Sequence, residues 1–128
     1  MTHRIEDLSE PRPLRSGDVR VLELLLSEEF PGHTDLLAQI PSLQLVAICS
    51  DCPSAEFTLA APARLADTHE RVPVEARGLD EDGVPIHLLV HVKDGAVSGI
   101  EVFREDGAVV REMPPLASLV VESSGPPH

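Results

Sequence analysis

The stretch VPIHLLVHVKDGAVSGIEVFREDGAVV, residues 84–110, decides the fold of this chain. It begins with an alternating pattern in which every second position is apolar: Ile86, Leu88, Val90 and Val92. Successive side chains of a β-strand point to opposite faces, so this pattern predicts a strand with one face in the core. The other face of that strand carries His87, Leu89 and His91.

Two turn signals divide the stretch into a three-stranded meander. Asp94-Gly95 is the first, because a two-residue primed turn needs positive φ at both positions and Asp-Gly supplies it at low cost. The return strand ends near Phe103, and a second turn at residues 105–107 precedes a third strand over residues 108–110. Consecutive strands joined by such short turns pair antiparallel.

The amino-terminal part of the chain predicts two helices. Ser16 can cap the first, whose apolar stripe follows the three-and-four spacing of a buried helix face: Val19, Leu22, Leu25 and Leu26. Pro31 disfavours helical geometry in Phe30, so this helix is expected to end there. Thr34 can cap a short second helix, which Pro41 closes.

The remaining segments predict further strands and two loose ends. Residues 43–49 and 54–60 alternate and form a hairpin, residues 72–77 suit an edge strand because of Pro73, and residues 116–121 are a last extended piece. The sequence therefore predicts an α+β fold, with one or two N-terminal helices packed on one face of a five- to six-stranded antiparallel sheet. A single domain is expected over residues 16–121, between a flexible arm at residues 1–15 and a flexible tail at residues 122–128.

The composition limits the partners that the chain can recognise. It has 128 residues, of which 22 are acidic and 10 are Lys or Arg, and a formal net charge of −12. This charge repels phosphate backbones and anionic lipid surfaces, so we expect no nucleic-acid partner and no membrane partner. Phe30, Phe57 and Phe103 are the only aromatic residues, which leaves few faces for base stacking. The sequence has neither a bilayer-spanning apolar run nor the apolar region of a signal peptide, which favours a cytoplasmic protein.

Cys49 and Cys52 frame the first candidate site, a Cys-Ser-Asp-Cys turn between two predicted strands. Two thiolates so close in sequence can share a metal ion or form a reversible disulfide, and structural zinc needs two further ligands. His33 and His69 are the candidates for these further ligands. Pro53 and a β-pattern follow the turn, whereas a redox dithiol normally opens a helix that lowers its thiol pKa. The sequence therefore favours an ordinary turn without metal or cofactor, and a thiolate metal site is the alternative.

His87 and His91 form the second candidate site, on the non-core face of their strand. Four residues at about 3.3 Å each separate them by roughly 13 Å, which is too far for joint ligation of one metal ion. Either histidine could act as a general base if a groove covers this face and Glu101 lies across the hairpin. The sequence favours two surface or interface histidines. The alternative is a small enzyme or ligand-binding protein that uses His87, His91 and Glu101.

Acidic residues in and around the meander form the third candidate: Asp80, Glu81, Asp82, Glu101, Glu105, Asp106 and Glu112. Their spacing lacks the regular ligand positions of an EF-hand calcium loop. They predict a solvated rim. The alternative is a negative surface that docks a basic protein by charge complementarity.

Several segments resemble a family of small uncharacterised actinomycete proteins. They are LLLSEEFPG at residues 24–32, LLAQI at residues 36–40, the turn that closes in Cys52-Pro53, GAVSGIEVF at residues 95–103 and the late Pro114-Pro115. The resemblance covers roughly residues 20–115. The turn of that family often holds three closely spaced cysteines before the proline, whereas this chain has two. The resemblance implies a bacterial, cytoplasmic, single-domain protein and implies no activity.

These features together favour a non-enzymatic binding or regulatory module that acts through protein contacts, of the immunity or accessory type. Val46, Ile48 and Leu89 put apolar groups on the sheet face opposite the helices, so we expect a homodimer through that face. A basic protein is the other expected partner. Protonation of His87 and His91 at this interface below about pH 6.5 is expected to weaken the dimer.

Overall fold

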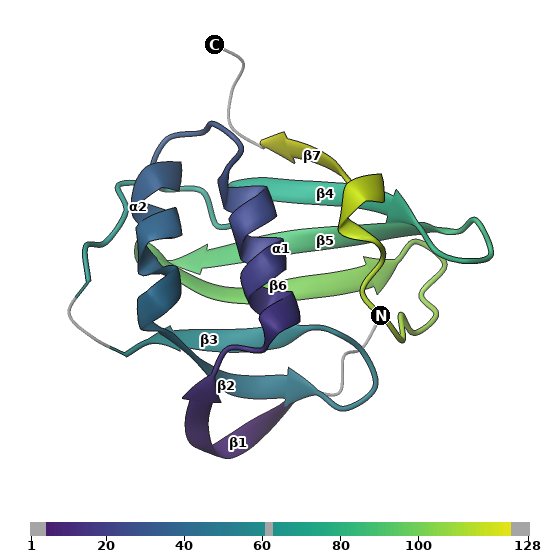
Figure 1. The fold of residues 1–128 in the computed structure, drawn as a ribbon, viewed down its shortest axis with the longest axis horizontal. Helices are drawn as coiled ribbons and strands as arrows, with labels where there is room; N and C mark the ends of the chain where they lie inside the picture. Colours follow the sequence, from purple (N-terminus) through teal and green to yellow (C-terminus); the bar gives the residue numbers. More distant parts are fainter. Residues whose placement is uncertain (1–4, 61–62, 124–128) are drawn as a thin grey trace.

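The computed structural model of the chain describes residues 5–60 and 63–123. Within these residues it has one antiparallel sheet of seven strands, two α-helices on one face of the sheet and two short 3-10 helices (Figure 1). The strands are β1 (Ile5–Pro13), β2 (Leu43–Cys49), β3 (Ala55–Leu59), β4 (Val74–Leu79), β5 (Pro85–Lys93), β6 (Ala96–Arg104) and β7 (Val120–Ser123). The helices are α1 (Ser16–Leu26), α2 (His33–Gln39), η1 (Ile40–Ser42) and η2 (Leu116–Ser118). The α+β class with an antiparallel sheet is thereby confirmed.

The β5–β6 hairpin forms as its sequence predicts. Asp94 has a φ of 52° and Gly95 a φ of 80°, the positive values that a primed two-residue turn requires. The apolar set on β5 is buried: Ile86, Leu88, Val90 and Val92. His87 and His91 alternate with this set and lie on the other face of the sheet.

The third strand of the predicted meander does not form, because residues 108–110 lie outside any strand. Gly107 has a φ of 81°, and after it the chain leaves the sheet, so that Val110 packs into the core. The second neighbour of β6 is β3, and the second neighbour of β5 is β4. The strand order is therefore β1-β2-β3-β6-β5-β4-β7 rather than that of a simple meander.

Strands at the two edges raise the number from the expected five or six to seven. Residues 5–13 were expected in a flexible arm and instead form β1, which pairs with β2. Proline is tolerated there because β1 is an edge strand whose ladder is interrupted between Asp7 and Arg12. Residues 1–4 of the expected arm lie outside the described residues.

The opposite edge is β7, which pairs with β4 and so places β4 inside the sheet. The edge position expected from Pro73 is wrong because that proline directly precedes β4 and leaves its hydrogen-bonding ladder intact. Residues 122 and 123, assigned to the flexible tail, complete β7. Residues 124–128 of that tail lie outside the described residues.

Both helices begin slightly earlier than predicted. Arg15, not Ser16, is the N-cap of α1, and its backbone N–H donates to the Asp18 carboxylate at 3.1 Å. Gly32, with a φ of 91°, is the N-cap of α2, where Thr34 was expected. No helix of the described chain is both long enough and apolar enough to cross a bilayer.

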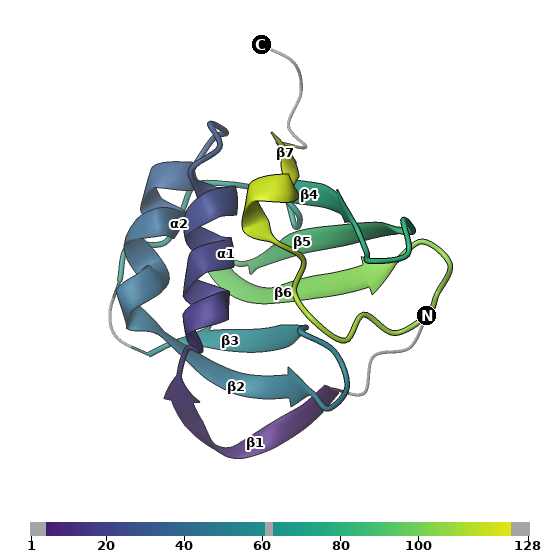
Figure 2. The ribbon, with the colours of Figure 1, turned by 45° about the vertical axis from the view of Figure 1, so that its right-hand side comes forward.

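The helices cover one face of the sheet and leave the other without a helical layer (Figure 2). Four side chains of α1 are fully buried against the sheet and α2: Val21, Leu22, Leu25 and Leu26. Val46 and Leu89 are partly exposed on the opposite face. Ile48, expected beside them, instead packs against the core, because a register shift in β2 between Leu45 and Ala47 pairs it with the buried Ala55. That second face is where most of the predicted site residues lie.

Candidate functional site

We call the sheet face without helices the open face. Its apolar side chains come from five strands: Val46, Leu79, Leu89, Phe103 and Val120. Among them Leu79 is 61% exposed and Val120 is 55% exposed. The polar residues between them include the histidines that the sequence analysis selected.

His91 and Glu101 meet on the open face. His91 Nε2 lies 2.9 Å from Glu101 Oε1, although the strand register puts His91 opposite Gly99 and Glu101 opposite Leu89. The pair lines an open cavity with a volume of about 390 Å³. Glu101 therefore lies across the hairpin from His91, as the general-base hypothesis requires.

Gly99 leaves the space for this cavity. In the register it lies between His91 on β5 and Glu56 on β3, and it presents no side chain. A Cβ at this position would come within 2.8 Å of the Ala55 carbonyl oxygen, so glycine allows β3 and β6 to approach here. The register shift at His91 and Val92 leaves Ser98 as an extra residue of β6, which bends that strand at the same place.

His87 belongs to a separate pair. Its Nε2 lies 2.9 Å from Glu105 Oε1, and its ring stacks on Phe103 with the ring centroids 5.1 Å apart. The His87 side chain is 18% exposed, against 39% for His91. The structure thus divides the predicted trio, because it joins His91 to Glu101 and gives His87 a different carboxylate.

The His91–Glu101 pair can hold a proton or accept one from a ligand. When Nε2 donates to the carboxylate, Nδ1 carries the lone pair and can accept a hydrogen bond. Lys93 and Ser98 also line the cavity and add polar groups beside the pair. The arrangement suits recognition of a small ligand that donates a hydrogen bond.

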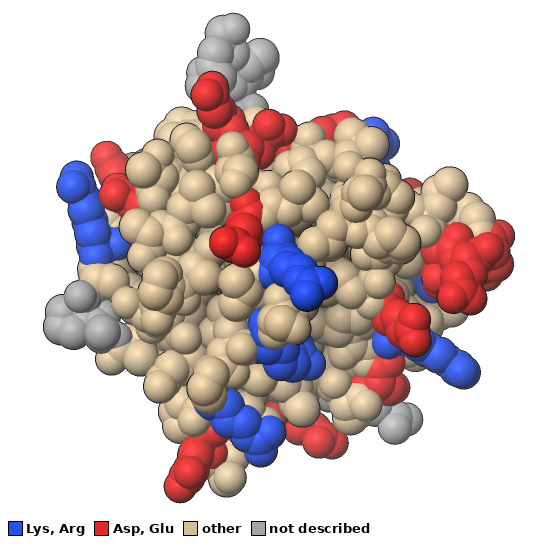
Figure 3. All heavy atoms as spheres, viewed as in Figure 1, with Lys and Arg blue, Asp and Glu red and all other residues tan. Residues whose placement is uncertain are grey.

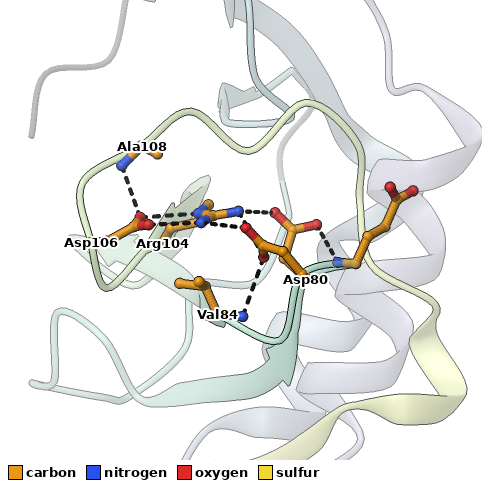
Figure 4. Close-up of polar contacts among 7 residues, drawn as sticks. Asp80, Val84, Arg104, Asp106 and Ala108 are labelled. Atoms are coloured by element: carbon orange, nitrogen blue, oxygen red, sulfur yellow. Dashed lines mark hydrogen bonds and ion pairs between the residues drawn. The ribbon is translucent and has the colours of Figure 1, made fainter.

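Arg104 brings much of the predicted acidic set together. Its guanidinium contacts Asp80 at 2.7 Å, Asp82 at 3.0 Å and Asp106 at 2.7 Å (Figure 4). Two of these carboxylates come from the β4–β5 turn and one from the turn after β6, so Arg104 joins the two turns. Sequence reasoning missed this role of Arg104. The available signal was a cation at residue 104 directly before the acidic turn at residues 105–107.

These contacts shift the pKa values of the cluster. Hydrogen bonds from Arg104 and then from the Ala108 N–H lower the pKa of Asp106 to about 2. Hydrogen bonds from Arg104 and the Val84 N–H lower the pKa of Asp82, and the carboxylates raise the pKa of Arg104 itself. Asp82 and Asp106 are therefore ionised at neutral pH, and the contacts with Arg104 form an internal ion-pair network.

The acidic charge does not form one continuous docking surface on the helical face. Figure 3 shows Lys and Arg along the middle of that face, with a dense group of Asp and Glu at the side where Figure 1 places the β4–β5 turn. That turn carries Asp80 and Asp82, whose carboxylates Arg104 already binds. The expected negative surface is thus partly neutralised from within.

The β2–β3 turn gathers three side chains that could ligate a metal ion. The ligand atoms of Cys49, Asp51 and Cys52 all lie within 4.8 Å of one another, and both cysteines are thiols. His33, at the start of α2, and His69, in the loop before β4, lie at the opposite end of the molecule (Figure 1). The ligand set that the sequence suggested is therefore not assembled, and Asp51 takes the place of these histidines.

Ser54 holds this turn in place, and no sequence pattern indicated that role. Its buried Oγ accepts a hydrogen bond from the Val102 N–H at 2.9 Å and donates to the Val102 carbonyl oxygen at 3.3 Å. The turn is thereby fixed to β6.

No family model, curated protein or solved structure matches this chain. The resemblance to uncharacterised actinomycete proteins stays a prediction based on the quoted segments.

Proposed function

We propose that this chain is a non-enzymatic binding module that acts through protein contacts at its open face. The observation that carries the proposal is the exposure of large apolar side chains on that face, above all Leu79 and Val120. Exposed apolar groups that lie close together favour association because their burial removes apolar surface from water.

These side chains are neighbours in the sheet. Val120 lies opposite Arg77, Arg77 opposite His87, and His87 opposite Phe103, so one row crosses β7, β4, β5 and β6. Leu79 lies on the same face of β4, two residues beyond Arg77. Val120, Arg77, His87 and Phe103, with Leu79 beside them, therefore form one contiguous surface. We call this surface the Val120 row.

The occupant that we propose is a second copy of the chain in a symmetric dimer. A two-fold axis would place one Val120 row against the other, which is the commonest way for a single surface to pair with itself. Arg77 is paired with Glu122, 3.0 Å away, so its own charge is balanced within the row. A basic protein, favoured by the net charge of −12, is the other occupant that the experiment must distinguish.

Sedimentation equilibrium of the full chain tests the dimer. We expect a dimer at micromolar concentration, and Val120→Lys should raise its dissociation constant by about tenfold or more, because each copy would bring an ammonium group into the interface. Val109→Lys is the matched control, since Val109 is 49% exposed and lies in the loop after β6. Leu79→Lys and Leu65→Lys, at residues 61% and 58% exposed, repeat the comparison.

A wild-type monomer at this concentration would contradict the dimer, as would equal effects of Val120→Lys and Val109→Lys. Binding of a basic protein that Val120→Lys abolishes, without any dimer, would assign the surface to that partner instead.

The proposal also includes a cytoplasmic location. The cysteine content supports it, because two cysteines three positions apart cannot staple a domain together as the disulfides of secreted proteins do.

A ligand site at His91 is the second candidate function. It is favoured by the cavity of about 390 Å³ beside the His91–Glu101 pair. Nuclear magnetic resonance of the histidine side chains, with a library of small amides and alcohols, tests it. Ligands that shift the His91 signals in the native chain but not in Glu101→Gln would support the site, and a library without such ligands would count against it.

A further inference from the structure

The β2–β3 turn carries a set of metal-binding atoms that the proposed function does not use. The Cys49 thiol donates a hydrogen bond to Asp51 Oδ1 at 3.2 Å, and Cys52 Sγ completes a triangle whose sides are all within 4.8 Å. In a tetrahedral zinc site, with bonds of roughly 2.0–2.3 Å, neighbouring ligand atoms lie about 3.5–3.8 Å apart. Small side-chain rotations would therefore bring these three atoms to ligand positions.

The backbone around these side chains is fixed from two directions. The Cys49 N–H donates to the Ser54 carbonyl oxygen at 3.0 Å, which closes the turn, and the Ser54 hydroxyl is anchored to Val102. Arg15 donates from Nη2 to the Pro53 carbonyl oxygen at 3.4 Å. Because the turn is held in this way, its ligands would lose little conformational entropy on binding an ion.

The burial of the three side chains leaves one direction open. Cys49 is buried, Cys52 is half-buried and Asp51 is exposed, so the site is closed toward the core and accessible from water. A solvent molecule can therefore occupy a fourth position. Three protein ligands with a fourth, exchangeable one are the pattern of accessible zinc sites, whereas closed structural sites use four protein ligands.

We propose that Cys49, Asp51 and Cys52 form a binding site for one zinc ion, with water as its fourth ligand. Two thiolates select a borderline-soft ion over magnesium or calcium, which prefer oxygen ligands alone. Binding converts two thiols to thiolates and releases two protons, so the net charge of the site stays at −1 when Zn²⁺ enters. Affinity for zinc therefore falls as the pH falls, because protons compete for the sulfur atoms.

Titration of the full, reduced chain with Co²⁺, followed by displacement with Zn²⁺, tests the site. We expect one equivalent of Co²⁺ to give a sulfur-to-cobalt charge-transfer band and the visible absorption of tetrahedral cobalt, and one equivalent of Zn²⁺ to remove both. Cys52→Ser should abolish the charge-transfer band at stoichiometric cobalt. Asp51→Asn should keep the band and weaken zinc binding by about tenfold or more, since even indirect partners of a metal contribute about 10–100-fold.

Asp67→Asn is the matched control, because Asp67 is also exposed and lies in the loop before β4. It should leave zinc affinity unchanged. Circular dichroism of each variant without metal verifies that it folds, and X-ray absorption at the zinc edge counts the sulfur ligands directly. A spectrum without charge transfer, a Cys52→Ser variant that binds zinc as well as the native chain, or equal losses in Asp51→Asn and Asp67→Asn would overturn the site.

Discussion

Arg104 gives the acidic end of the molecule its order. Asp80 and Asp82 from one turn and Asp106 from another would repel where the turns meet, but each accepts a hydrogen bond from the Arg104 guanidinium. The fork of donors in arginine matches carboxylate geometry, which an ammonium group does not. Only 11% of the Arg104 side chain is exposed, so water screens these contacts less than those of an ordinary surface pair. We infer that the cluster stabilises the two turns that it joins.

The pKa values of this cluster predict how stability depends on acid. Asp106 has a pKa of about 2, below its usual 3.8, and Asp82 is shifted in the same direction. A carboxylate with a lowered folded-state pKa contributes stability above its unfolded pKa, and this contribution is lost as the pH falls through the folded value. Stability from the cluster should therefore be complete above about pH 4 and decline toward pH 2.

Arg104→Met tests this prediction by thermal unfolding between pH 2 and pH 7. We expect a lower Tm than that of the native chain at pH 7, and a difference that shrinks as the pH falls below about 4. Arg111→Met is the control, because Arg111 is exposed and forms no ion pair within the described chain. A difference in Tm that stays constant down to pH 2 would show that the cluster does not stabilise the fold.

Helix α2 is joined to the β5–β6 hairpin by one buried side chain, Gln39. Its amide nitrogen donates to the carbonyl oxygens of Arg64 at 3.0 Å and Gly95 at 2.9 Å, and its amide oxygen accepts from the Val97 N–H at 3.0 Å. Gln39 is 1% exposed, so water cannot replace these partners. The helix, the hairpin turn and the loop before β4 therefore meet at a single amide.

Gln39→Leu should destabilise the fold by about 2 kcal/mol or more, because each buried backbone group left without a partner costs about 1–3 kcal/mol. The Gly95 carbonyl oxygen still accepts a hydrogen bond from the Ala66 N–H in this variant. Most of the lost stability therefore comes from the Arg64 carbonyl oxygen and the Val97 N–H, which are left without this partner. Urea unfolding measures it. Gln44→Leu, at a partly exposed glutamine of β2, is the matched control and should change stability by less than about 0.5 kcal/mol. Equal midpoints for the two variants would contradict the role of Gln39.

The structure changes the expected effect of pH on the whole assembly. His87 and His91 each lie 2.9 Å from a glutamate, so protonation turns each histidine–glutamate pair from a charge of −1 to 0. In a two-fold dimer, protonation therefore removes the repulsion between the negative pairs of the two copies. Histidines without carboxylate partners would instead become positive and repel each other across the axis. The dimer is therefore expected to persist or tighten in mild acid, which reverses the expectation from sequence.

Sedimentation at about pH 7.5 and about pH 5.5, on either side of the ordinary histidine titration, measures this effect. The native dimer should be no weaker at the lower pH. The double variant Glu101→Gln with Glu105→Gln should instead weaken as the pH falls, since its protonated histidines lack a neutralising carboxylate. A native dimer that dissociates in acid would place unbalanced positive charge at the interface and contradict this assignment.

Local sequence patterns were sufficient for both α-helices and for the strands of the two hairpins, but not for β1. The buried set on β5, the primed turn at Asp94-Gly95 and the apolar stripe of α1 follow from side-chain alternation, from positive φ and from helical spacing. All three depend on residues close together in the chain. The position of the β2–β3 hairpin, whose first strand ends at Cys49, depends on such residues as well.

Contacts between distant segments decided everything else. Three features depend on which strand edges compete for hydrogen-bond partners: the place of β3 beside β6, the pairing of β1 with β2, and the loss of the third meander strand. The alternation of apolar and polar residues does not indicate which edges pair. The candidate sites follow the same division. The sequence selected His91, Glu101 and the two cysteines as residue types, but their true neighbours were set by strand register and turn geometry. A register shift of one residue would have sent His91 to the other face of the sheet.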